Sequence, residues 1–135
     1  MAARTDTAYG SLMAGMALAS ARLGVVHGLA HPLGVRYDIP HGLVCGVLLP
    51  AAIRLNYGHA KDKYDLLSHI AGKPLAAYAT ELLVKVGMPT DLRAYRIPES
   101  DLPAIVADAM PSGSLKANAK KVTDEDVVWM LRQVV

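Results

Sequence analysis

The sequence of 135 residues has no phenylalanine and only one tryptophan, Trp129. Hydrophobic residues still make up 53% of the chain and charged residues only 19%, a composition that excludes an intrinsically disordered protein. Because aromatic side chains are scarce, we expect an aliphatic core in which small residues allow close helix contacts. The length suits one domain, residues 1–135, with a core of its own.

Cysteine is also nearly absent, since Cys45 is the only one. A disulfide within the chain is therefore excluded, which is typical of a reducing compartment, and we expect a cytoplasmic protein. Cys45 stands in the apolar run of residues 43–47. We predict that it is a small buried side chain and not a reactive thiol.

Neither charge nor hydropathy points to a large partner surface. The net charge is +2, and the densest basic group is Lys116, Lys120 and Lys121, which we interpret as solvated surface and not as a nucleic-acid site. No segment is long and apolar enough to span a membrane. Residues 7–21 lack charge but also lack a strong leucine run, so they do not match a secretory signal. We therefore expect no nucleic-acid and no membrane partner.

Hydrophobic residues recur with helical spacing along almost the whole chain. Gly24, Gly72 and Gly87 would end three helices, and Thr123 with Asp126 resembles a capping box that starts the last one. No alternating strand pattern competes, so we predict an all-α fold, a compact bundle of six or seven helices. The expected helices cover residues 6–23, 25–37, 41–57, 61–71, 74–86, 99–110 and 124 onward.

Several of these helices have an apolar face that we expect in the core. The spacing of i, i+4, i+7, i+8 and i+11 in residues 74–86 is typical of a buried stripe. The expected core residues are Val44, Val47, Leu48, Ala51 and Leu55 in the third helix, Leu75, Ala79, Leu82, Leu83 and Val86 in the fifth, and Val127, Leu131 and Val134 in the last.

Three of the five histidines, His27, His31 and His41, lie within fifteen residues among apolar neighbours. An unpartnered buried ring costs roughly 1–3 kcal/mol, and metal coordination or proton transfer would supply partners. His27 and His31 are four residues apart, so they share a helix face. His41 falls at a predicted helix start, where the dipole favours the neutral, metal-binding imidazole. Taken singly, each ring would more often be a satisfied core residue, but the clustering favours a functional site.

The residue that follows His27 and the positions of the other two histidines restrict the kind of metal site that is expected. Gly28 and not glutamate follows His27, which disfavours the zinc-protease motif. His59 and His69 stand on or beside charged predicted helices, and we expect them to face solvent.

The histidine window resembles the signature of the iron-dependent (group III) alcohol dehydrogenases. The similarity lies in residues 24–34 (GVVHGLAHPLG), 39–42 (IPHG) and 48–50 (LLP), with further matches at residues 13–17 and 123–127. Members of that family join an N-terminal α/β domain that binds NAD or NADP to a C-terminal all-α domain that holds a divalent metal. The resemblance covers nearly the whole chain and implies the C-terminal domain.

The resemblance also implies roles for the three histidines. His27 and His41 would be two of four metal ligands, and His31 would lie near the nicotinamide and substrate as a proton relay. The metal, Fe²⁺ or Zn²⁺, would polarise the oxygen of a small alcohol or aldehyde, and hydride would pass to or from NAD(P).

Departures from the family pattern are equally informative. The other two ligands, an Asp and a His, have no counterpart, and the glycine-rich phosphate-binding segment is missing. Asn118-Ala119-Lys120 replaces an Asn-Pro-Arg stretch of many relatives, which would alter that loop. The resemblance therefore implies a metal-binding domain without its nucleotide-binding half, inactive on its own.

Two other hypotheses remain open. A non-catalytic metal-binding or self-associating module would bring two His27/His41 pairs together across a symmetry axis, through a face that normally packs on the nucleotide-binding domain. A relict bundle would keep its histidines for structure alone. The expected partner is thus a second copy in a homo-oligomer or a nucleotide-binding half from another source.

Overall fold

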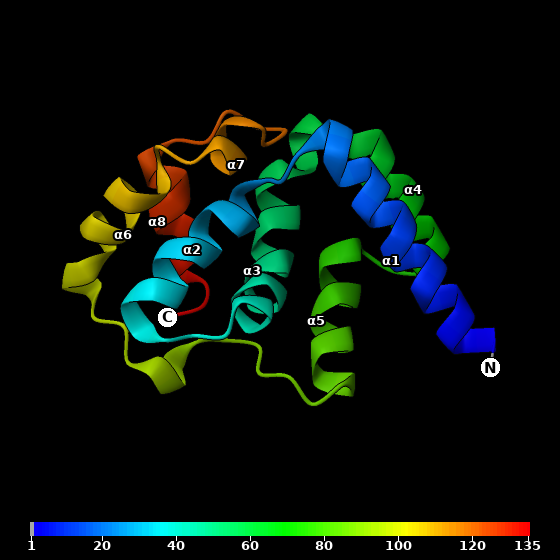
Figure 1. Ribbon diagram of the computed structural model, residues 1–135, viewed down its shortest axis with the longest axis horizontal. Coiled ribbons are helices and arrows are strands. Elements are labelled where there is room, and N and C mark those ends of the chain that lie inside the picture. The colour runs from blue at the N-terminus through cyan, green and yellow to red at the C-terminus, as the bar shows by residue number, and fades with distance from the viewer. Residues whose placement is uncertain (1) are drawn as a thin grey trace.

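The computed structural model describes residues 2–135, which form helices joined by short connections (Figure 1). This part of the chain contains no strand, so the all-α prediction is confirmed. It has eight α-helices, one more than the upper expectation, because α7 forms four residues long where we expected a loop. The elements are α1 (Ala2–Ala21), α2 (Val25–Tyr37), α3 (His41–Asn56), η1 (Tyr57–His59), α4 (Lys61–Ala71), α5 (Leu75–Lys85), η2 (Arg93–Tyr95), η3 (Glu99–Asp101), α6 (Leu102–Ala109), α7 (Gly113–Lys116) and α8 (Asp124–Arg132).

Glycines end two helices as predicted, and the third prediction is wrong. Gly72 and Gly87 have the positive φ angles of 70° and 74° that follow α4 and α5, a conformation that glycine adopts without strain. The helix expected to stop at Gly24 ends at Ala21, and Arg22 adopts the left-handed conformation at φ 61°. Gly24 is instead the extended residue that precedes α2.

The capping box that was predicted for the last helix is present in α8. The Thr123 side chain accepts from the Asp126 backbone N–H at 3.3 Å, and the Asp126 carboxylate accepts from the Thr123 N–H at 3.0 Å. Lys120 pairs with the same carboxylate. Two N–H groups that the helix leaves unpaired are thereby satisfied.

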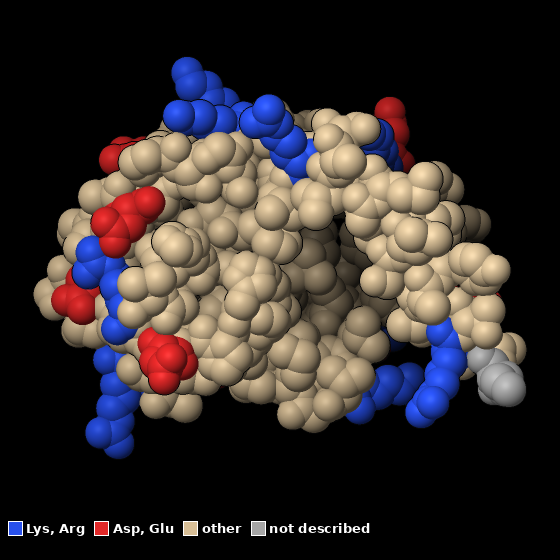
Figure 2. Space-filling model, viewed as in Figure 1, with Lys and Arg blue, Asp and Glu red and all other residues tan. Residues whose placement is uncertain are grey.

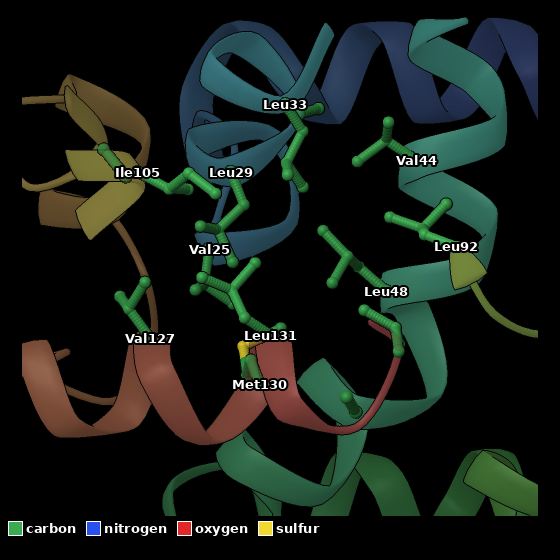
Figure 3. Packing of buried hydrophobic residues seen from close by; sticks show 14 of the residues in the cluster. Val25, Leu29, Leu33, Val44, Leu48, Leu92, Ile105, Val127, Met130 and Leu131 are labelled. Atoms are coloured by element: carbon green, nitrogen blue, oxygen red, sulfur yellow. The ribbon is translucent and has the colours of Figure 1, made fainter. Parts of the chain in front are cut away.

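The core lies where α2, α3, α6 and α8 pack together, and their side chains point into a shared interior (Figure 3). As expected, it is aliphatic. Its largest fully buried side chains are Leu29, Leu33, Leu48, Leu92, Ile105, Met130, Leu131, Val25, Val44, Val47 and Val127.

The predicted apolar faces are correct for α3 and α8 but only partly correct for α5. In α5, Ala79 and Leu83 are buried, whereas Leu82 and Val86, which follows the helix, are 46% and 62% exposed. The reason is position, because α5 lies at the edge of the bundle and packs mainly on α3 and α4. The side of α5 that faces away from them stays open.

Helix α1 differs from the other α-helices because every one of its residues is exposed. It runs along one edge of the molecule and begins near the N-terminus (Figure 1). No single described helix has both the length and the hydropathy to cross a membrane; α1 and α2 meet that test only as a pair, which is bent by 98°. Its large exposed side chains are Tyr9, Leu12, Met13, Met16 and Leu18.

Candidate metal centre

Two helix starts bring His27 and His41 together. His27 lies in the first turn of α2, and His41 is the first residue of α3. Between the helices Asp38 adopts a left-handed conformation (φ 53°), which reverses the chain so that α3 packs along α2. The two rings lie with centroids 5.4 Å apart and planes tilted by 52°.

Cys45 completes a group of three potential ligands. It follows His41 by one helical turn, and its Sγ lies 3.4 Å from His41 Nε2. The ligand atoms of His27, His41 and Cys45 all lie within 4.8 Å of one another. The prediction of a buried hydrophobic Cys45 is only partly correct, since the side chain packs against the core but is half-buried and faces the histidine pair. The missed signal was its spacing of four residues from His41.

The other histidines lie outside this group. His31 is exposed on α2, one turn beyond His27. His59 and His69 are exposed as predicted. The structure therefore brings two of the three histidines of the window, His27 and His41, close together and places the Cys45 thiol beside them.

The electrostatics of the group suit metal binding. Partial burial, and secondarily the charge of His41, lower the pKa of His27, so its ring favours the neutral form that coordinates metals. Burial raises the pKa of the Cys45 thiol, which therefore keeps its proton until a cation displaces it. Two imidazoles and a thiol are donors that fit Fe²⁺ or Zn²⁺.

An apolar cleft opens beside these ligands. It has a volume of about 580 Å³. Its walls are the end of α1, the start of α2, one side of α3 and the loop that follows α7. His27 and Cys45 stand in its wall together with Leu49 and Ile53. Figure 2 shows a hollow beside α1 on a largely uncharged face, with most Lys and Arg side chains at the edges. Such a lining suits a small, mostly apolar ligand whose polar atom meets the ligand group.

Comparison with known proteins settles the family. The family model described as "Fe-containing alcohol dehydrogenase family, C-terminal" matches residues 1–135. The chain belongs to this family. The iron-dependent alcohol dehydrogenase resemblance is thereby confirmed, and with it the expectation of an all-α C-terminal fold.

Relatives in the family are longer than this chain. A 1,3-propanediol dehydrogenase of Klebsiella pneumoniae is 34% identical, over 97% of this chain and 37% of its own length. A lactaldehyde reductase of Escherichia coli (strain K12) is 32% identical, over 91% and 35%. A crystal structure of a 1,3-propanediol oxidoreductase superposes with a TM-score of 0.88 at 33% identity, over 93% and 36%. The chain thus spans little more than a third of the length of these relatives.

A pair of asparagines holds the first turn of α2, which carries His27, and sequence reasoning did not find this pair. Asn56 and Asn118 exchange side-chain hydrogen bonds of 3.1 and 2.7 Å. The Asn118 Oδ1 also accepts from the backbone N–H of Val25 at 3.2 Å, two residues before His27. The pair thereby ties the end of α3 and the loop after α7 to the first turn of α2.

Gly28, beside His27, allows α2 and α7 to approach closely. A Cβ at this position would lie 1.8 Å from Leu115 Cδ1 and 3.2 Å from its Cγ, and Leu115 is buried. Overpacking costs about 1–3 kcal/mol, against a helix-propensity gain of about 1 kcal/mol. We therefore expect Gly28→Ala to lower the free energy of unfolding by about 1 kcal/mol, measured by urea denaturation.

Gly42→Ala in α3 is the matched control. A Cβ there would meet nothing within 4 Å, so only the propensity gain applies and no loss of stability is expected. Equal stability changes in the two variants would contradict the close approach at Gly28.

Proposed function

We propose that this chain forms the metal-binding helical part of an NAD(P)-linked alcohol dehydrogenase-type oxidoreductase, with His27 and His41 as ligands to a divalent metal. The convergence of these two rings from separate helix starts, with centroids 5.4 Å apart and His27 in the wall of an apolar cleft, carries the proposal. The names of the relatives, a propanediol dehydrogenase and a lactaldehyde reductase, support a small alcohol or aldehyde as substrate.

The residues of the chain divide the work. When bound, Fe²⁺ or Zn²⁺ would supply Lewis-acid polarisation of a substrate oxygen, and a nicotinamide cofactor would supply or accept the hydride. His27 and His41 hold the cation through neutral ring nitrogens. The apolar cleft wall holds the substrate carbons and excludes water. His31, exposed one turn beyond His27, carries the alcohol proton between substrate and solvent as a general base or acid.

The nucleotide-binding part is the proposed partner of the α1 side of the molecule. Along α1 the exposed fractions of Leu12, Met13 and Met16 are 57%, 63% and 68%, and such apolar exposure favours burial against another protein surface.

A second candidate function, self-association without catalysis, is supported by the same helix. A molecular mass that rises with concentration and falls when Met13 and Met16 become glutamate would favour it.

The metal content of the purified chain tests the proposal. We expect about one divalent metal per chain after reloading and loss of that metal in the His27→Ala/His41→Ala variant, because two of its donors are gone. Elemental analysis measures both. His31→Ala should retain the metal, since that ring is assigned to proton transfer.

His69→Ala is the control for a general effect of removing histidine, because His69 is exposed on α4. It should leave the metal content unchanged. Metal that persists in the double variant, or a wild type that takes up none, would contradict the assignment of His27 and His41.

A further inference from the structure

We propose that Cys45 is a third metal ligand beside His27 and His41, and that its thiolate makes the site prefer Zn²⁺ to Fe²⁺. This inference rests on the proposed function, because it concerns the same site. The ligand set implied by the family resemblance contains no cysteine, so the assignment comes from the position of the thiol in this structure.

The distance between Cys45 and His41 matches one edge of a zinc tetrahedron. Zn–S and Zn–N bonds of about 2.3 and 2.0–2.1 Å at a tetrahedral angle place the sulfur and nitrogen about 3.5 Å apart. The observed distance from Sγ to His41 Nε2 is 3.4 Å. Both residues project from the same face of α3, so the edge exists without any backbone movement.

His27 turns this pair into a site. A Cys–His contact alone is equally well explained as a weak hydrogen bond. The third donor comes from a different helix, and all three ligand atoms lie within 4.8 Å of one another. His41 is exposed, and the cleft reaches His27 and Cys45. A cation can therefore enter and keep a fourth position open, as in catalytic zinc sites.

The thiolate explains the metal preference. Imidazole accepts both Zn²⁺ and Fe²⁺, whereas a soft thiolate favours Zn²⁺ in a mononuclear site. On binding, the S–H proton passes to solvent and the sulfur electron pair forms the bond to the metal. No redox step is required.

Cobalt(II) is the probe for this ligand, because it occupies tetrahedral zinc sites and shows a near-ultraviolet sulfur-to-cobalt charge-transfer band. Cys45 is the only cysteine, so in thiol-free buffer such a band reports this side chain alone. We expect the band in the wild type and in the His69→Ala control, and its loss in Cys45→Ser. The affinity should fall at least tenfold, since even outer-shell partners are worth roughly 10–100-fold.

The outcomes separate this proposal from the function on which it rests. Cobalt that binds without the band, and is lost in His27→Ala/His41→Ala, overturns the thiolate assignment but leaves the histidine site standing. Absence of cobalt binding overturns both. A band that survives in the double histidine variant would mean that Cys45 binds alone, which overturns the three-donor site.

Competition between Zn²⁺ and Fe²⁺ without oxygen tests the preference itself. The ratio of bound zinc to bound iron should fall on the order of tenfold or more in Cys45→Ser. An unchanged ratio overturns the selectivity. The wild-type band already tests ligation if the serine variant fails to fold, and far-ultraviolet circular dichroism shows whether it does.

Discussion

Replacement of Asn118 by alanine is expected to lower the free energy of unfolding by about 2–4 kcal/mol. Its side chain bonds Asn56, the Val25 N–H and the Lys120 carbonyl. Asn56 is 6% exposed, so its amide would lose partners that water cannot fully replace. Each buried polar group left unpaired costs about 1–3 kcal/mol. Urea denaturation followed by circular dichroism measures the change.

A double-mutant cycle is the control for this effect. Asn56→Ala/Asn118→Ala removes both amides, so neither is left without the other, and its cost should be clearly less than the sum of the single variants. Simple additivity would show that the two amides act independently. Asn118→Ala should also weaken metal binding at His27. The reason is that Asn118 accepts from the N–H of Val25, the first residue of the helical turn that carries His27.

The parts of the fold that could be predicted from the sequence depend on local signals. The left-handed Gly72 and the capping box of Thr123 and Asp126 involve residues at most four apart, and the structure contains both. Helical spacing likewise placed α2 and α4 at their observed bounds. The turn before α2 lies earlier than predicted because Arg22 adopts a conformation that glycine usually provides.

Periodicity shows which side of a helix is apolar but not what covers it. Leu82 and Leu83 belong to the same predicted stripe, yet Leu83 is buried and Leu82 is 46% exposed. The Asn56–Asn118 pair joins residues 62 apart in the sequence, and no local pattern predicts such a contact.

In the candidate site, too, local sequence signals predicted one part and packing between helices decided the other. The histidine window predicted where ligands would gather, and the distance between the His27 and His41 rings supports that expectation. Cys45 was interpreted from its apolar neighbours, because the rotation of α3 against α2 is set by packing. That rotation puts Cys45 toward His27 and Leu48 into the core.

Leu48→Ala should lower the free energy of unfolding by about 2–5 kcal/mol. Leu48 is fully buried where α3 meets the core (Figure 3), so truncation leaves a cavity. That loss is a large part of the 5–15 kcal/mol typical of a domain. Leu49→Ala is the matched control on the same helix, since Leu49 is 45% exposed and should cost less than about 1 kcal/mol. Both are measured by urea denaturation. Similar losses for the two would mean that α3 is rotated differently, and the same rotation would carry Cys45 away from His27.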